Sequence, residues 1–194
     1  MDRNRVAKIW IYRGLCDLFF AFNCDDVAFE DNERFSEIMG LEKFLKALLL
    51  FHRYQEYESV PDTEARSKLN QMAMKLGHDF DGMLKTALAL GLVDIDRILA
   101  TDFDGYVGAG LVRAVKAGYM ETRYPVPNPI SDSFPIGNGF THDPLASSGI
   151  TKFVYALCNA CFHALAAHVD FSDVIRQFRE TYQVSINLTA YFRR

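Results

Sequence analysis

Cys158 and Cys161, followed closely by His163 and His168, carry side chains that commonly bind zinc. Structural zinc sites usually place a turn between paired cysteines, whereas these two lie inside an apolar segment with helical spacing. At 100° per residue, His163 points about 200° away from Cys161 around such a helix. We therefore expect the two cysteines to be buried as small apolar residues, and we expect no metal site.

A glycine-rich stretch at residues 105–110 is a second place where chemistry is conceivable. A dinucleotide-binding loop needs a preceding strand and a third glycine, but residues 94–104 are acidic and Arg113 stands at the last position. The same stretch fails the calcium-loop pattern, because Ala100 and Leu111 occupy end positions that must be acidic. With no G-x-S-x-G or H-E-x-x-H motif in the chain, we expect no cofactor and assign no catalytic residue.

The remaining candidates for ligand binding are His78, Asp79, Arg123 and Tyr124. A histidine at a helix start can contact a phosphate together with the free backbone N–H groups there. A structural interpretation stands beside this one: Asp79 caps the helix, His78 bonds a backbone carbonyl, and Arg123 and Tyr124 anchor the loop that follows. If a pocket exists, we expect it under residues 125–149.

The elements that position these residues are helices almost throughout. Gly77 ends one predicted helix, and Asp79 is the predicted N-cap of the next. No segment shows sustained strand alternation, so we expect an all-α protein. Helical spacing of apolar residues predicts helices near residues 6–22, 41–57, 62–76, 80–90, 95–100, 111–117, 150–169 and 172–183.

The predicted helix over residues 41–57 has the clearest apolar face of the chain. Its polar residues Glu42, Lys43 and Lys46 fall opposite that face, where we expect solvent. Glu42 and Lys46 are four residues apart and form a favourably oriented ion pair, worth about 0.3 kcal/mol on an exposed helix.

Residues 123–149 contain every proline except Pro61 and cannot continue a helix. A loop of this length is either functional, packed or mobile. We expect a single helical domain over residues 1–194, with a core at about 41–170, this Pro/Gly-rich loop, and a C-terminal helix at about 172–183.

Two local patterns resemble the HEPN superfamily of nucleotide-binding domains. The first is LEKFLKALLLF at residues 41–51, followed after a spacer helix by GHDFDGML at residues 77–84. The second is Tyr119 with Arg123, Tyr124 and Pro125. The resemblance covers residues 41–125, and the helix at residues 150–169 would be the fourth helix of the bundle. It implies an up-down helical bundle with extra helices, and a homodimer.

Many HEPN proteins are metal-independent ribonucleases with an R-x4–6-H motif, whereas others bind nucleotide, RNA or a nucleotidyltransferase partner. No arginine here precedes a histidine at that spacing. The resemblance therefore implies a non-catalytic module that binds nucleotide, RNA or a protein. The alternative is a ribonuclease with a dispersed site drawn from Arg66, His78, Arg123 and His142. A third hypothesis is a small-molecule site in the apolar core beside Cys158 and His163.

Composition limits the compartment and the partners. The 194-residue chain has a net charge of −4 and a pI of about 5.7, which argues against a duplex-DNA-binding protein. The longest uncharged stretch, residues 153–169, contains Asn159 and two histidines, so we expect no membrane span. Cysteines within apolar helical patterns are typical of free thiols, and we expect a cytoplasmic protein.

Overall fold

The computed structural model describes residues 1–23, 30–123 and 147–183. Within these ranges the regular elements are helices apart from one short hairpin, which confirms the prediction of an all-α bundle. The elements in order are α1 (Arg3–Asn23), α2 (Glu30–His52), the 3-10 helix η2 (Tyr54–Glu56), α3 (Asp62–Leu76), α4 (Phe80–Ala89), α5 (Val93–Ala100), β1 (Asp102–Phe103), β2 (Tyr106–Val107), α6 (Gly108–Arg123), α8 (Ser148–Ala166) and α9 (Ser172–Tyr182).

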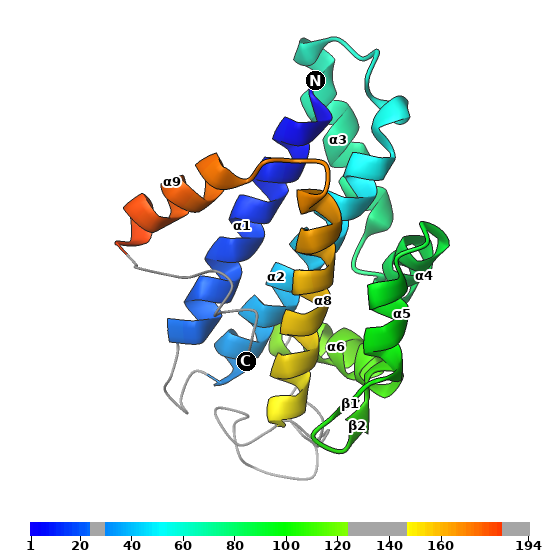
Figure 1. The fold of residues 1–194 in the computed structure, drawn as a ribbon, viewed down its shortest axis with the longest axis vertical. Helices are drawn as coiled ribbons and strands as arrows, with labels where there is room; N and C mark the ends of the chain where they lie inside the picture. The colour runs from blue at the N-terminus through cyan, green and yellow to red at the C-terminus, as the bar shows by residue number, and fades with distance from the viewer. Residues whose placement is uncertain (24–29, 124–146, 184–194) are drawn as a thin grey trace.

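The helix α2 is the centre of the molecule. It runs antiparallel to α1 and beside α8, and it also contacts α3, α4 and α6 (Figure 1). Nearly every residue from Leu41 to Phe51 is buried, including residues on the side predicted to face solvent. A helix enclosed by so many neighbours has no continuous solvent face, and this decides the environment of its charged residues.

Two glycines allow α1 and α2 to approach closely. A methyl group added at Gly14 of α1 would lie 2.6 Å from Cδ2 of Phe44, and one added at Gly40 would lie 2.7 Å from Cδ2 of Leu18. Both distances are below van der Waals contact, so alanine at either position forces a shift of a buried side chain.

The predicted boundaries around α3 and α4 are confirmed. Pro61 precedes α3, and Gly77 ends it with a φ of 57°, which a residue with a side chain rarely adopts. Asp79 is the N-cap of α4, because its side chain accepts a hydrogen bond of 3.1 Å from the backbone N–H of Gly82.

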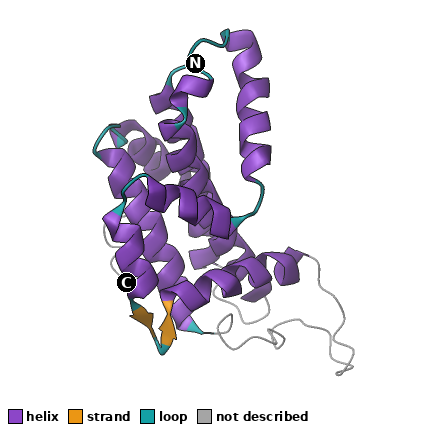
Figure 2. Ribbon diagram, turned by 90° about the vertical axis from the view of Figure 1, so that its right-hand side faces the viewer, coloured by secondary structure: helices purple, strands orange, loops and turns teal. Residues whose placement is uncertain are grey.

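The hairpin of β1 and β2 was not predicted from the sequence. Asp104 and Gly105 form its turn with φ values of 55° and 90°, as in the tight turns that join antiparallel strands. Lys152 and Ser148 of α8 bind the Asp104 carboxylate. Two-residue strands are too short to show alternation, which is why the sequence gives no strand signal. Figure 2 shows the hairpin, in orange, at one end of the helices.

The predicted helices at residues 95–100 and 111–117 are longer in the structure, where they form α5 and α6. The predicted loop 123–149 lies mostly outside the described residues. Among the described helices, none has a stretch long and apolar enough to cross a membrane.

Candidate functional site

His78 lies on the turn between α3 and α4 and contacts two distant helices. Its Nδ1 is 2.6 Å from Oε2 of Glu42 on α2, and its Nε2 is 2.7 Å from the hydroxyl of Tyr119 on α6. The rings of His78 and Tyr119 also stack, with centroids 4.1 Å apart. The side chain of His78 remains 43% exposed, so one edge of this contact reaches solvent.

Glu42 is shared between His78 and a lysine of its own helix. Its Oε1 accepts a hydrogen bond of 2.6 Å from Nζ of Lys46, and that ammonium lies 5.9 Å from the ring centroid of Trp10. Glu42 is 3% exposed and Lys46 is 6% exposed. We define Glu42, Lys46, His78 and Tyr119 as the Glu42 network.

The burial of Glu42 and Lys46 corrects the prediction of a solvent-facing pair. The predicted spacing is right and the ion pair forms, but both side chains are enclosed because α1, α4, α6 and α8 pack around α2. A buried ion pair behaves differently from an exposed one, because removing either partner leaves the other charge without compensation.

The two partners of His78 constrain which of its ring nitrogens donates a hydrogen bond. The Glu42 carboxylate accepts from Nδ1–H, while Nε2 accepts from the Tyr119 hydroxyl when the ring is neutral and donates to it when the ring is protonated. Across the described residues, every buried side-chain nitrogen and oxygen has a hydrogen-bond partner. Within the Glu42 network, Glu42 and His78 each use both of their side-chain polar atoms.

A second buried ion pair lies nearer the start of α2. Nη1 of Arg34 is 2.6 Å from Oε2 of Glu37, and it also donates to the hydroxyl of Thr151 on α8. Burial raises the pKa of Glu37 above its ordinary value, although the neighbouring Arg34 guanidinium acts in the opposite direction. This pair joins α2 to α8 inside the core, where it is out of reach of a ligand.

The four predicted site residues have different outcomes. His78 belongs to the Glu42 network, so its partners are side chains and not the backbone carbonyl of the structural interpretation. Asp79 is a helix cap, as that interpretation proposed. Arg123 is the last residue of α6, and its side chain is not described. Tyr124 lies outside the described residues, as do the residues predicted to cover a pocket. A ligand-binding role for the four residues remains a prediction.

The residues of the dispersed ribonuclease site are not all brought together. Arg66 is exposed on α3, ten residues before its last residue, which is about 15 Å along a helix axis. His142 lies outside the described residues. Sequence reasoning missed Glu42 as a partner of His78, because no local pattern joins residues 36 positions apart.

Cys158 and Cys161 are fully buried in α8, which confirms the prediction of apolar, core-packed cysteines. Burial raises the pKa of both thiols, that of Cys161 to about 12, so both are protonated at neutral pH. His163 is exposed on the same helix and therefore faces different surroundings. Within the described residues, no three metal-binding side chains gather at one point.

Comparisons of the chain with known protein families, with curated proteins and with solved structures find no match.

Proposed function

We propose that this protein is a non-catalytic, HEPN-like helical module that acts as a homodimer and binds a nucleotide, RNA or a protein partner, such as a nucleotidyltransferase. The proposal combines the sequence resemblance at residues 41–125 with the arrangement of the Glu42 network. The two lines of support are independent, because the resemblance says nothing about the partners of His78.

The main observation in favour of a non-catalytic protein is that both ring nitrogens of His78 are hydrogen-bonded to other side chains. A histidine that acts on the 2′-hydroxyl of RNA needs one ring nitrogen free to accept or deliver a proton. Here Nδ1 bonds Glu42 and Nε2 bonds Tyr119. A substrate hydroxyl would have to displace Tyr119, which is itself buried and stacked on the imidazole.

Among the candidate arginines whose side chains are described, the position of Arg66 supports the same conclusion. Cleavage of RNA needs a cation beside the phosphate to stabilise the charge that develops in the transition state. Arg66 lies about 15 Å along α3 from the end of that helix, too far for it to share one phosphate with His78. Lys46 is the nearest cation of the Glu42 network, but its ammonium is buried against Glu42.

The homodimer part draws support from exposed apolar side chains on α1. Ile9 is 51% exposed and Phe20 is 54% exposed. Eleven residues separate them, which places them within about 20° of each other around the helix. Exposed apolar side chains on one side of a helix are the kind of surface that a second copy can cover.

A ribonuclease remains the second candidate, because one observation favours it. A buried carboxylate on Nδ1 of a half-exposed imidazole is the arrangement that orients a general acid or base. If Tyr119 moves when RNA binds, Nε2 becomes available for proton transfer.

Cleavage of RNA by the purified protein in excess chelator separates the two candidates. We expect no cleavage at high protein concentration, and we expect melting shifts with a nucleotide or an RNA without turnover. A ligand at a hundred times its dissociation constant stabilises the folded state by about 2.7 kcal/mol.

The control variants are H78A and H163A, since His163 is an exposed histidine outside the Glu42 network. Cleavage that disappears in H78A and persists in H163A would contradict the non-catalytic module and place the active site at His78. The absence of both cleavage and melting shifts would direct the search to a protein partner.

A further inference from the structure

Three nitrogen-bearing side chains gather around one aromatic ring where α2 ends. The guanidinium carbon of Arg3 lies 4.7 Å from the ring centroid of Phe51. The imidazole of His168 stacks on that ring with centroids 5.8 Å apart, and the imidazole of His52 meets it edge-on at 5.5 Å. We define Arg3, Phe51, His52 and His168 as the Phe51 cluster.

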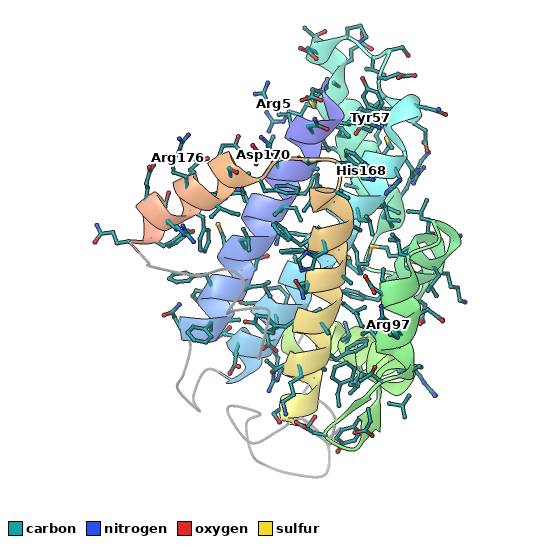
Figure 3. All side chains as sticks on the ribbon, viewed as in Figure 1. Arg5, Tyr57, Arg97, His168, Asp170 and Arg176 are labelled. Atoms are coloured by element: carbon teal, nitrogen blue, oxygen red, sulfur yellow. The ribbon has the colours of Figure 1, made fainter. Side chains whose placement is uncertain are left out.

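The three polar groups come from different parts of the chain and reach solvent. Arg3 begins α1, His52 ends α2, and His168 follows α8. All three are exposed, whereas the Phe51 ring beneath them is 3% exposed. In Figure 3, His168 lies at the same end of the molecule as Arg5 and Tyr57.

The hydrogen-bonding capacity of the cluster is unused within the described part of the chain. The side chains of Arg3, His52 and His168 have ring contacts there, but none donates a hydrogen bond to a protein acceptor. An arginine offers five N–H groups and a protonated histidine offers two. Such a set is suited to an acceptor that comes from outside the chain.

The carboxylates nearest in sequence are engaged elsewhere. Asp2 accepts from the backbone N–H groups of Asn4 and Arg5, Glu56 pairs with Arg53, and Asp170 accepts from Ser172. On α9, Asp173 pairs with Lys8. None of these carboxylates forms an ion pair with the cluster.

The electrostatics of His52 agree with an excess of positive charge. Burial lowers the pKa of His52 below its ordinary value, and the neighbouring His168 and Arg3 lower it further. Charges that oppose the protonation of a histidine attract an anion to the same place.

We propose that Arg3, His52 and His168 form a binding site for a phosphate group. The planar guanidinium of arginine matches two phosphate oxygens at once, and each histidine adds a donor when it is protonated. The Phe51 ring is covered, so it offers no open face on which a nucleobase could stack. The donors that surround this ring are therefore suited to the phosphate.

This inference rests on the proposed function, because it names the chemical group through which a nucleotide or an RNA end would be held. Free phosphate and a nucleoside monophosphate present the same group. An affinity for phosphate is nevertheless separable from RNA cleavage, since the Phe51 cluster contains no residue of the Glu42 network.

The test is a titration of the full chain with sodium phosphate, followed by NMR of the histidine side chains. The pH is held at about 6.5, the ordinary pKa of histidine. Sodium chloride keeps the ionic strength constant. We expect the signals of His52 and His168 to shift and saturate, the pKa of His52 to rise, and the signal of His163 to remain unchanged. Adenosine 5′-monophosphate and adenosine are titrated in the same way.

The matched variants are R3Q and R5Q, since Arg5 is an exposed arginine on the same turn of α1. R3Q removes a charged hydrogen-bonding partner and is expected to weaken phosphate binding about tenfold. R5Q is expected to bind phosphate with the affinity of the wild type. If adenosine 5′-monophosphate binds at least as tightly as phosphate and adenosine does not bind, the result supports the site and identifies a nucleotide as its ligand. If phosphate binds more tightly than the nucleotide, the result supports the site and identifies free phosphate as its ligand.

Three results would overturn the site: shifts that do not saturate, equal weakening in R3Q and R5Q, or adenosine binding as well as the monophosphate. These results differ from the result that would contradict the proposed function, which is RNA cleavage that depends on His78.

Discussion

The helix α2 carries two polar clusters that differ in how their hydrogen bonds are satisfied. In the Glu42 network, the carboxylate binds Lys46 and His78, and Tyr119 binds the second nitrogen of the imidazole. In the Phe51 cluster, nine residues beyond Glu42 along α2, exposed donors surround a buried ring and meet no protein acceptor within the described residues.

The difference separates a structural role from a binding role. A buried polar network whose members satisfy one another fixes the positions of the helices that supply them, here α2, α6 and the turn before α4. An exposed group of donors contributes little to the fold, and its unused capacity is available to a ligand. Substitutions in the two clusters should therefore affect different measurements.

The largest effect is expected from E42A. This change leaves the Lys46 ammonium buried without its counter-charge and removes the acceptor of His78. Breaking a buried pair in this way costs about 3–5 kcal/mol of unfolding free energy. Urea unfolding measures the loss.

Two further variants test the reason for that loss. E64A removes an exposed glutamate on α3 and should change the unfolding free energy by no more than about 0.5 kcal/mol. The double variant E42L/K46M replaces the whole pair with apolar side chains and should recover most of the stability. A loss below about 1 kcal/mol in E42A would show that water reaches the pair.

A smaller effect is expected from Y119F, which keeps the ring stacked on His78 but removes the hydroxyl. The lost hydrogen bond is worth about 1 kcal/mol, reduced because water can reach the half-exposed His78. Thermal unfolding measures it, with Y106F as the control, since the Tyr106 hydroxyl has no protein partner within the described residues. Equal losses in the two variants would mean that the Tyr119 hydroxyl contributes nothing specific.

The smallest effect concerns the pH dependence of stability. Because the pKa of His52 is lowered in the folded state, the unfolded chain binds more protons at this residue below about pH 6.5. The folded state is therefore destabilised as the pH falls through 6.5 toward the lowered pKa, and the effect is absent at higher pH.

In H52N this part of the pH dependence should disappear. We expect a difference of about 0.3 kcal/mol between the variant and the wild type at acid pH, since solvent screens an exposed group. Chemical unfolding at several pH values measures it. Phosphate should stabilise the wild type at acid pH more than H52N, which retains Arg3 and His168. A steeper pH dependence in H52N would contradict the lowered pKa.

The sequence predicted the fold wherever a local signal marks a boundary. Pro61 and Gly77 delimit α3 and Asp79 caps α4, because each of these residues acts on the backbone beside it. The apolar spacing of α8 likewise predicted a buried helix, and nine of its residues are buried.

The candidate site could be predicted only in part, because it depends on distant contacts. The sequence drew attention to His78, but its partners are 36 and 41 residues away. The apolar face of α2 predicts one buried side of the helix, and it cannot show that His78, on the turn before α4, and Tyr119 of α6 cover Glu42 as well. The charged residues of the opposite side were therefore predicted on the surface.

The close approach at Gly14 and Gly40 also has a consequence for the order of folding. The two helices are neighbours in the chain, since Asn23 ends α1 and Glu30 begins α2. Bringing them together closes only a short loop, and short loops lose little entropy and form quickly. The glycines permit a single close register, with Phe44 against Gly14 and Leu18 against Gly40. We therefore expect this helical pair to form the folding nucleus, a template on which the later helices assemble.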